Sequence, residues 1–471
     1  MRQDGKVSRL CCNSTPGQMA VKYPDMRWIV LFAVFATACS GTRSISDVAP
    51  VAPDAGTSFD YRVMAGTRLS FLANDHPWVH HTAARIGDFE ALTGISVVFD
   101  VYPEEQFRVK RTVEMRSGIS GYDVFMIMPG NSLSEYHAMG WVESLDPFIH
   151  DSSLAWPDYN LSDLYPSALE AGVRDGKLYS IPVLLETSIL AYNKKIFADY
   201  GIKVPTTMEE LEAAAAAIKV RSGGRIAGIT MRGRDMSATS QWVDFLHSFG
   251  GEWLWPDGTA AIDSPRSVEA LGFYGRLLRE YGPRDATRTG WYESVSVFMR
   301  GEAGMIYDAN LFRTHYEDGV HSGIAGNVGY AVIPAGPAGS VPHVSHWGLA
   351  IDPGSGNKKA AWLFIQWASA DEQALSAHRA GIPSARESVW NFPVFTGNDP
   401  AAEWTRASTR SYEMATFQWN PPVIDTARAR QIVGEAITAA ILGQDIPMAA
   451  RRASDGLNEI LSLERKGTTG P

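Results

Sequence analysis

Residues that commonly carry out catalysis are present in this sequence, but not in the spacings of a known catalytic centre. The chain has no H-E-x-x-H, no G-x-S-x-G, no C-x-x-C and no phosphate loop ending in G-K-[ST]. The glycine-rich stretch 354–358 (GSGNK) lacks the spacing of such a loop, so we predict a turn before a helix. The sequence therefore contains no motif that indicates an enzyme, and no cofactor or metal is expected.

Two other groups could bind a metal or transfer protons. His80 and His81 are adjacent, and neighbouring positions on a helix face different directions, so surface histidines are the simpler interpretation. Glu186 and Asp308 could form the acid/base pair of a glycosidase, but the sequence alone does not bring them together. A cleft enzyme therefore stays open as an alternative.

The N-terminal segment, which ends before Cys39, indicates that the protein is exported. Residues 28–38 (WIVLFAVFATA) form an uncharged apolar run that is too short to span a bilayer, for which about 20 residues are needed. Met26-Arg27 precedes this run, and the A-x-A sequence 36–38 followed by Cys39 resembles a bacterial lipobox, although Ala36 stands where Leu is usual. We predict a signal peptide over 1–38, followed either by lipidation of Cys39 or by ordinary cleavage.

Removal of this segment changes the composition of the chain. The 471 residues carry 42 Lys and Arg against 52 Asp and Glu, a net charge of −10, and loss of residues 1–38 moves it to about −13. Such an acidic chain lacks the basic patch of a nucleic-acid binder. Cys11 and Cys12 are lost as well, so no disulfide is expected. Residues 39–65 are rich in Ser, Ala, Pro and Asp and are predicted to be a flexible tether.

From residue 68 onwards, strands alternate with helices. Strands are predicted at 69–74, 95–102, 121–128, 304–309 and 347–352. A first helix is predicted after the strand at 69–74 and ends at about residue 92. Further helices are predicted over 208–220, 265–281 and 357–369, and Thr207 and Glu210 form a capping box at the start of the helix over 208–220. Alternation of this kind predicts an α/β fold, and because the units exceed one ordinary sheet, we expect two α/β lobes.

Six segments in this order resemble the extracellular solute-binding proteins of ABC importers, the large type that includes maltose- and polyol-binding proteins. The most specific is 175–211 (DGKLYSIPVLLETSILAYNKKIFADYGIKVPTTMEEL). The other five are 66–99, 121–149, 248–283, 298–309 and 347–373. The resemblance covers residues 66 to about 463, and 250–286 is most similar to the members that bind polyols and oligosaccharides.

The resemblance implies a type II periplasmic-binding-protein fold, in which two lobes, each a mainly parallel sheet flanked by helices, are joined by a hinge. The N-terminal lobe would comprise 66–184 with 347–385, and the C-terminal lobe 185–346 with 386–465. Such a protein closes on its solute, and the closed form is the state that an ABC permease recognises. We therefore expect a monomeric, exported binding protein, held at a bacterial membrane through Cys39 and partnered by permease subunits.

Positions that match the family's binding segments give the candidate ligand contacts. These are Asn74, Asp75, Trp78, Met128, Asn131, Glu186, Ser240, Trp242, Asp308, Asn310, Trp347 and Arg386. Carboxylates, amides and guanidinium groups would bind sugar hydroxyls, while aromatic rings would cover the C–H faces. Arg386 is the one basic residue among them, which argues against phosphorylated or sulfated ligands. Substitution of Glu186 or Asp308 by Ala is expected to abolish binding with little loss of stability.

The resemblance leaves two alternatives open besides the glycosidase. The same fold could serve as the sensor lobe of a membrane receptor kinase. The ligand could also be a solute other than a sugar, such as a polyamine, a metal chelate or an amino acid. Among carbohydrates, the sequence does not separate a monosaccharide, an oligosaccharide and a polyol.

Overall fold

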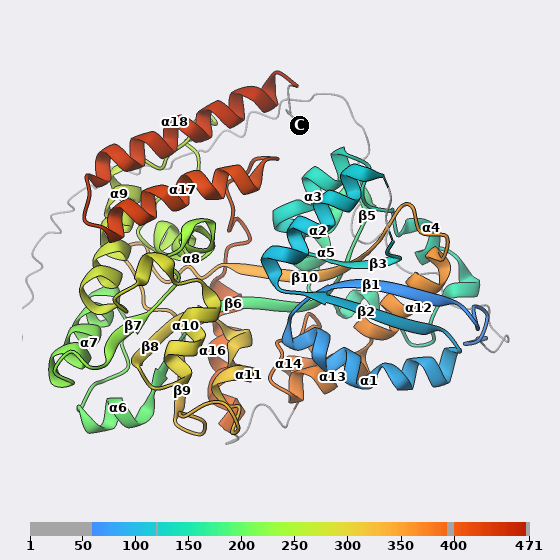
Figure 1. The fold of residues 1–471 in the computed structure, drawn as a ribbon, viewed down its shortest axis with the longest axis horizontal. Helices are drawn as coiled ribbons and strands as arrows, with labels where there is room; N and C mark the ends of the chain where they lie inside the picture. Colours follow the sequence, from blue (N-terminus) through green and yellow to red (C-terminus); the bar gives the residue numbers. More distant parts are fainter. Residues whose placement is uncertain (1–58, 119–120, 393–399, 468–471) are drawn as a thin grey trace, which may run out of the picture. The chain divides into compact units, whose positions relative to one another are not determined.

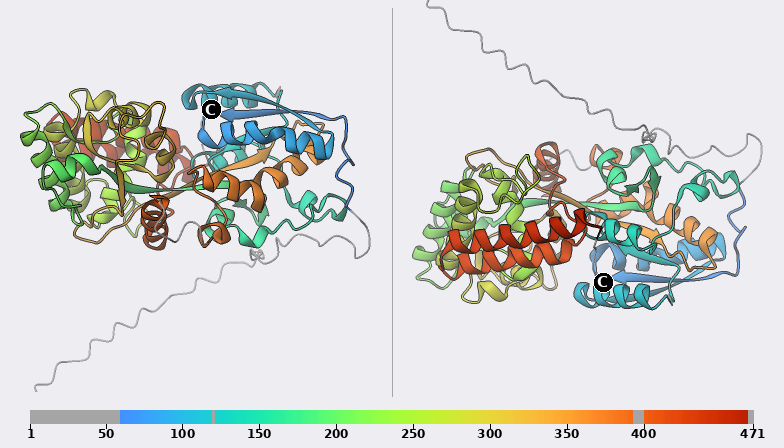
Figure 2. Two further views of the ribbon diagram at one scale, coloured as in Figure 1. Left: turned by 90° about the horizontal axis from the view of Figure 1, so that it is seen from below. Right: turned by 90° about the horizontal axis from the view of Figure 1, so that it is seen from above.

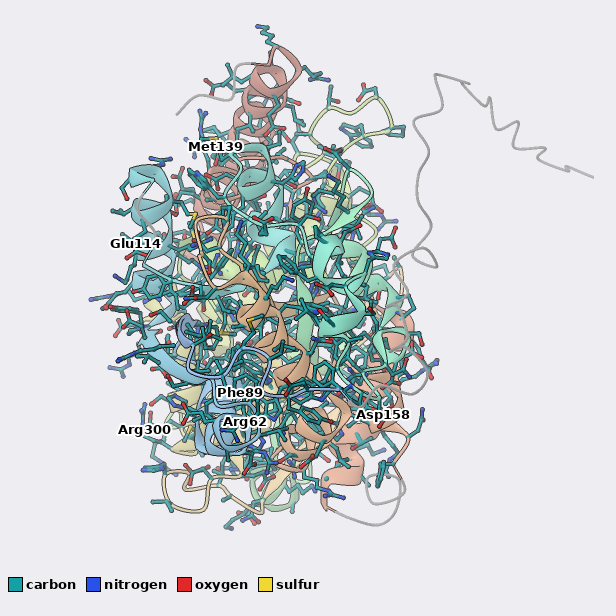
Figure 3. The ribbon with its side chains drawn as sticks, turned by 90° about the vertical axis from the view of Figure 1, so that its right-hand side faces the viewer. Arg62, Phe89, Glu114, Met139, Asp158 and Arg300 are labelled. Carbon is teal, nitrogen blue, oxygen red and sulfur yellow. The ribbon has the colours of Figure 1, made fainter. Side chains whose placement is uncertain are left out.

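The structure is a computed structural model that describes residues 59–118, 121–392 and 400–467, all within one compact unit. The predicted signal peptide, Cys39 and most of the predicted tether lie outside the described residues. The tether was expected to continue to residue 65, but Phe59 and Met64 pack against the hydrophobic core. Arg62 lies near the end of the helix that carries Phe89 (Figure 3). Gly94 follows that helix, and a Cβ added to it would lie 3.2 Å from the Nη2 of Arg62.

Three parallel strands form the centre of the first lobe (Figure 1). They are β1 (Arg68–Asn74), β2 (Ser96–Tyr102) and β3 (Val124–Ile127), with β1 in the middle. The packing helices are α1 (Pro77–Thr93), α2 (Glu104–Ser117), α3 (Pro129–Ala138), α4 (Asp146–Ile149), α5 (Pro166–Ala171), α12 (Lys358–Ser369), α13 (Asp371–Arg379) and α14 (Glu387–Trp390). A two-stranded hairpin, β4 (Val173–Arg174) and β5 (Lys177–Leu178), lies beside them. The predicted strands and helices of this lobe are confirmed.

Two long strands connect this sheet to the second lobe. β6 (Ile181–Asn193) pairs through its first half with β10 (Val344–Ile351), which in turn pairs with β3. The second half of β6 pairs with β8 (Ala303–Ala309) and β9 (Val328–Ala331). These pairs are antiparallel, whereas β7 (Ala227–Thr230) lies parallel to β8. One strand thus contributes to both lobes, so residues at its middle face the space between them.

Helices pack around the second-lobe strands (Figure 2). They are α6 (Lys194–Asp199), α7 (Met208–Arg221), α8 (Asp235–Ser248), α9 (Pro265–Arg276), α10 (Trp291–Met299), α11 (Arg313–Tyr316), α16 (Pro400–Met414), α17 (Thr426–Ile441) and α18 (Ile446–Arg465). As predicted, Thr207 caps α7 by accepting a hydrogen bond from the backbone N–H of Glu210. The carboxylate of Glu210 in turn accepts hydrogen bonds from the backbone N–H and the hydroxyl of Thr206.

The boundary predicted between residues 385 and 386 falls inside the first lobe. Arg386 is 1% exposed and donates hydrogen bonds to the carbonyl oxygens of Ser369 and Asn160, both in the first lobe. Trp390 of α14 then packs edge-on against His378 of α13, with ring centroids 4.4 Å apart. Trp390 also packs against Trp404 and Tyr412 of the helix at 400–414, so this segment contacts both lobes.

Candidate functional site

A cavity lies where the crossing strands meet the ends of β1, β3 and β8, and both lobes line it. Its volume is about 60 Å³, counted as the space open to the centre of a water molecule. Seven predicted contact residues line this cavity: Asn74, Met128, Asn131, Glu186, Ser240, Asp308 and Trp347. Glu186 and Asp308, which the sequence could not place together, are thus brought into one site by the pairing of β6 with β8.

An ion pair fixes the second-lobe wall of the cavity. Asp308, at the end of β8, accepts hydrogen bonds from the Nε and Nη2 of Arg232, which follows β7. Burial acts to lower the pKa of Arg232, but the charge of Asp308 and these hydrogen bonds outweigh it and raise the pKa. Gln241 accepts from the backbone N–H of Arg232 at 2.8 Å. The carboxylate therefore has a fixed direction before any ligand binds.

A histidine orients the carboxylate on the crossing strand. His76 caps α1, because its Nδ1 accepts from the backbone N–H of Trp78 at 3.2 Å. In the neutral ring the proton is then on Nε2, which lies 3.3 Å from Oε1 of Glu186 and donates to it. Nearby, the Oδ1 of Asn74 is buried and has no hydrogen-bond partner among the described residues. An acceptor left this way in a cavity wall is available to a ligand hydroxyl.

A third carboxylate links the lobes at the cavity wall. Glu104 of α2 accepts hydrogen bonds from Arg108 of the same helix and, at 3.1 Å, from Nε1 of Trp291 on α10. Burial acts to raise the pKa of Glu104, but the charge of Arg108 and the hydrogen bonds from Arg108 and Trp291 lower it to about 2. Glu104 is therefore ionised at neutral pH and contacts both lobes.

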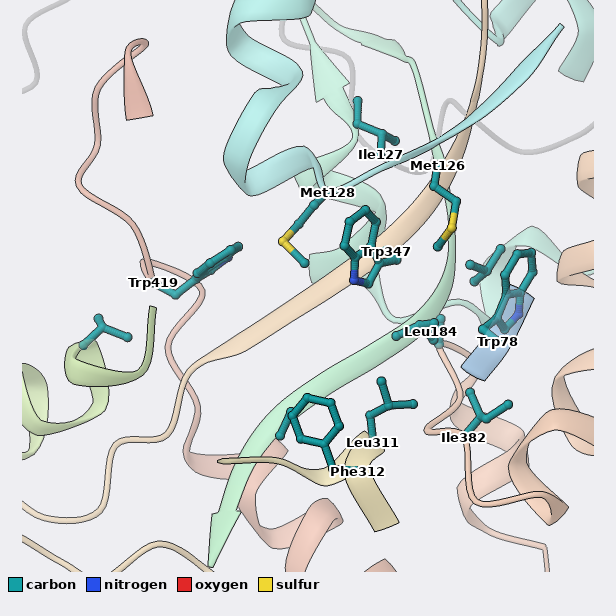
Figure 4. Close-up of a cluster of buried hydrophobic side chains, with 14 of the residues drawn as sticks. Trp78, Met126, Ile127, Met128, Leu184, Leu311, Phe312, Trp347, Ile382 and Trp419 are labelled. Carbon is teal, nitrogen blue, oxygen red and sulfur yellow. The ribbon is translucent and has the colours of Figure 1, made fainter. Parts of the chain in front are cut away.

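Aromatic rings complete the walls. Trp347 lies 6.0 Å from the ring of His76, and Trp291 stacks on Phe312 with centroids 5.1 Å apart. Trp419 stacks on His343. In Figure 4, Met128 lies between Trp347 and Trp419, while Phe312 lies across the crossing strands. Flat apolar surfaces and fixed polar groups together suit a small molecule with both C–H and O–H faces.

Five of the predicted contact residues do not line the cavity. Trp78 and Trp242 are buried in the core at 2% and 0% exposure, and Figure 4 shows Trp78 beside Leu184 and Ile382. Asp75 points outward and contacts His80. The side chain of Asn310 binds the backbone N–H of Thr187 and the side chains of Ser408 and Tyr412. Arg386 holds first-lobe carbonyl groups, as described above.

The expectation that Arg386 is the basic residue of the site is therefore wrong. Three other arginines line the cavity instead: Arg108, Arg232 and Arg430. Glu104, Trp291, Trp419, Gln241 and His343 were missed as well. Arg232 lies just beyond Met231 at the end of the buried strand β7. A similar position identified Asn74 and Met128, but the strand β7 was not predicted. The others lie on helices or in loops, where no local pattern marks a residue that faces a cleft.

The comparison with protein families agrees with this architecture. The model of the bacterial extracellular solute-binding proteins matches residues 82–375, more than half of the chain. The chain belongs to this family. The predicted fold class, a two-lobed type II periplasmic-binding-protein fold with a hinge, is confirmed.

Similar proteins have been characterised in several bacteria. The erythritol/L-threitol-binding protein of Mycolicibacterium smegmatis is 30% identical over 353 residues, which cover 71% of this chain and 73% of that protein. The mannitol-binding protein of Pseudomonas aeruginosa is 27% identical over 64% of this chain and 70% of that protein. The ribitol complex of an ABC transporter solute-binding protein from Agrobacterium radiobacter aligns with a TM-score of 0.75 and 25% identity, over 84% of this chain and 99% of that one.

The family is defined by transport rather than catalysis, and its members are extracellular. Within the described ranges, no helix combines the length and the apolar character needed to cross a membrane.

Proposed function

We propose that this protein captures a small linear polyol in the interlobe cavity and delivers it to an ABC permease. The observation that carries the proposal is the pair of oriented carboxylates, Glu186 and Asp308, which line one cavity together with Asn74, whose Oδ1 has no hydrogen-bond partner in the described part of the chain. Glu186 is held by His76, and Asp308 accepts hydrogen bonds from Arg232 and from the backbone N–H of Ala309. The lone pairs that these donors leave free can accept from ligand hydroxyl groups. The relatives that bind erythritol, L-threitol, mannitol and ribitol support this ligand class.

The size of the cavity favours a polyol over an oligosaccharide. The cavity is small, with about 60 Å³ open to the centre of a water molecule. A short linear polyol needs less room than a disaccharide. We therefore expect tetritols to hexitols to bind in preference to maltose.

The charges of the site favour an uncharged ligand in its central part. Glu104, Glu186 and Asp308 balance Arg108, Arg232 and Arg430, and two of these arginines are bound to carboxylates. A neutral polyol can bind such groups without disturbing the balance, and charge-assisted hydrogen bonds to hydroxyls give it strong contacts.

Delivery would follow from closure about the crossing strands. A solute that touches Asn74 on one side and Asp308 on the other, with Glu186 on the crossing strand between them, favours the closed arrangement, which presents the loaded protein to permease subunits. We propose residues 66–184 with 347–390 as the N-terminal lobe and the remainder to 465 as the C-terminal lobe. Lipidation of Cys39 would hold the exported protein at the bacterial membrane, and cleavage without lipid is the alternative.

A thermal-shift panel tests the ligand class. Erythritol, L-threitol, ribitol, D-mannitol, glucose and maltose would be added to the purified protein, with putrescine and glutamine as non-carbohydrate solutes. A ligand that binds the folded state alone stabilises it by about 2.7 kcal/mol at a hundredfold excess over Kd. A shift with one or more polyols but not with maltose supports the proposal. A shift with putrescine or glutamine alone would overturn it.

A further inference from the structure

A second cavity, with a volume of about 540 Å³, adjoins the binding cavity. The first lobe lines it with α2, and the second lobe lines it with the first turns of α8 and α17. Arg108, Asn131 and Arg430 line both cavities, so these three residues lie at their junction. This junction is distinct from the group formed by Glu186, Asp308 and Asn74.

Arg430 lies at this junction without a carboxylate partner among the described residues. It is 7% exposed, and its Nη1 and Nη2 donate to Oδ1 of Asn131 and to the carbonyl oxygen of Met236. Its Nε is buried and has no hydrogen-bond partner within the ranges that the structure describes. Burial and the charge of Arg108 lower the pKa of Arg430 to about 9, so it remains charged at neutral pH. A buried charge of this kind is costly unless another group compensates it.

The N-terminus of α8 opens onto the same cavity. No side chain caps this helix, since Arg234 at the N-cap position makes no capping hydrogen bond. Uncapped backbone N–H groups and the helix dipole attract negative charge. Two carboxylates also line this cavity, those of Glu105 and Asp235, and Glu105 is held by Arg234 at 3.1 Å. The lining therefore has three arginines against two carboxylates.

We propose that Arg430, Asn131 and the N-terminus of α8 form a subsite for an oxyanion, a carboxylate or a phosphate group, at the junction of the two cavities. Asn131 belongs to the first lobe, whereas Arg430 and α8 belong to the second, so an anion held between them favours the closed arrangement. The anion is either part of the transported solute or a separate molecule that binds beside it. Neither case depends on which polyol the first site takes.

Calorimetry and thermal unfolding of the purified protein test this subsite. The probes are inorganic phosphate, D-mannitol and D-mannonate, which is mannitol with one end oxidised to a carboxylate, all at constant ionic strength. The variants are Arg430→Met and, as a matched control, Arg428→Met on the same helix, where the side chain is exposed and pairs with Glu459. Arg430→Lys keeps the charge but loses the forked donors of the guanidinium, so it should weaken anion binding about tenfold. This variant replaces Arg430→Met in the test if the Met variant does not fold.

Two results support the subsite and separate the sources of the anion. A rise in Tm with phosphate of about 2 °C or more, in the parent and in Arg428→Met but not in Arg430→Met, identifies a separate anion. Binding of mannonate about tenfold or more tighter than mannitol, lost in Arg430→Met and displaced by phosphate, identifies a charged end of the solute.

The subsite is refuted if the parent responds to neither anion, or if Arg430→Met responds as the parent does. A response to phosphate without any binding of polyols would overturn the proposed function and leave the subsite standing. Binding of mannitol without any effect of phosphate or mannonate would refute the subsite and leave the proposed function standing.

Discussion

Asp308 has two roles, because its carboxylate faces the cavity and also pairs with Arg232. The side chain of Asp308 is 2% exposed and that of Arg232 is 17% exposed, so removal of the acid leaves a largely buried cation. We predict that Asp308→Asn weakens polyol binding about 100-fold and lowers the free energy of unfolding by about 3 kcal/mol. The earlier expectation of little stability loss overlooked this partner. Isothermal calorimetry and urea unfolding measure the two effects.

Glu186→Gln is the matched comparison. Glu186 has no Arg or Lys ion-pair partner among the described residues; His76 donates to it, and its side chain is 12% exposed. The Glu186→Gln variant should lose polyol affinity to a similar degree as Asp308→Asn, while its free energy of unfolding falls by only about 1 kcal/mol. Equal stability losses in the two variants would contradict the role assigned to Arg232.

Glu104 gives a prediction for acid stability. Its pKa of about 2 lies below the ordinary value of 4.5, so its contribution is fully present above pH 4.5 and is lost as the pH falls towards 2. The difference corresponds to roughly 2–3 kcal/mol for this side chain, which is 24% exposed. Urea unfolding from pH 7 to pH 3 should show Glu104→Gln less stable than the parent at pH 7, with the gap narrowing below pH 4.5. A difference in unfolding free energy between the two proteins that stays constant with pH would refute this role of Glu104.

Residues of the site could be predicted where a strand ends in the cavity. Asn74, Met128 and Asp308 each end or directly follow a buried strand, and Glu186 lies in the middle of the crossing strand. Trp291 and Arg430 lie on helices whose cavity-facing sides look, in sequence, like any other helix face. Arg386 matched the family's pattern but is used to join first-lobe segments, which only the tertiary structure shows.

At the scale of whole elements, α17 depends on small residues for its packing against α8 and α9. A Cβ on Gly434 of α17 would lie 2.5 Å from the backbone of Asp235, where α8 begins. Gly434→Ala should therefore cost about 1–3 kcal/mol of stability and displace the start of α8. Gly272 of α9 is the control, because a Cβ there meets only Ile446 at 3.7 Å.

Gly272→Ala should instead stabilise the protein by about 0.5–1 kcal/mol, since alanine favours the helix interior. Urea unfolding of the two variants measures both effects. Destabilisation by both, or by neither, would mean that the spacing between α17 and α8 does not depend on Gly434.

The elements themselves were predictable where local signals are strong. β1, β2 and β8 are short apolar strands, and α1 ends at Gly94, whose φ of 71° suits glycine. The length of β6 was not predictable, because its two halves pair with different strands in different lobes. The C-terminal helices α16, α17 and α18 were not predicted at all. Their partners lie far away in sequence, so long-range packing determines their positions.

At the scale of the whole molecule, contacts between the lobes determine how readily the cavity closes. Trp291 on α10 donates to Glu104 on α2, and Arg430 of α17 donates to Asn131 of α3. Arg234 pairs with Glu105 at the cavity rim, where the side chains are 34% and 82% exposed. Exposed pairs of this kind contribute about 1 kcal/mol or less. The Trp291–Glu104 hydrogen bond is therefore the best single contact with which to test closure.

Trp291→Phe keeps the ring contact with Phe312 but removes the hydrogen bond to Glu104. Because ligand binding is coupled to closure, loss of a contact between the lobes lowers the apparent affinity for the polyol. We predict a three- to tenfold rise in Kd, which corresponds to about 0.7–1.4 kcal/mol. This cost is at or below the low end of the range for a hydrogen bond to a charged group, because water reaches Glu104. Calorimetry measures Kd, and Trp255→Phe at an exposed position is the control.

Small-angle X-ray scattering completes this test. At saturating polyol the variant should reach the same radius of gyration as the parent, because the ligand still favours the closed arrangement, but it should need a higher polyol concentration to do so. An unchanged Kd would show that the Glu104–Trp291 contact forms equally in the open and closed states. A larger radius of gyration at saturation would show that closure requires this contact and is not driven by the ligand alone.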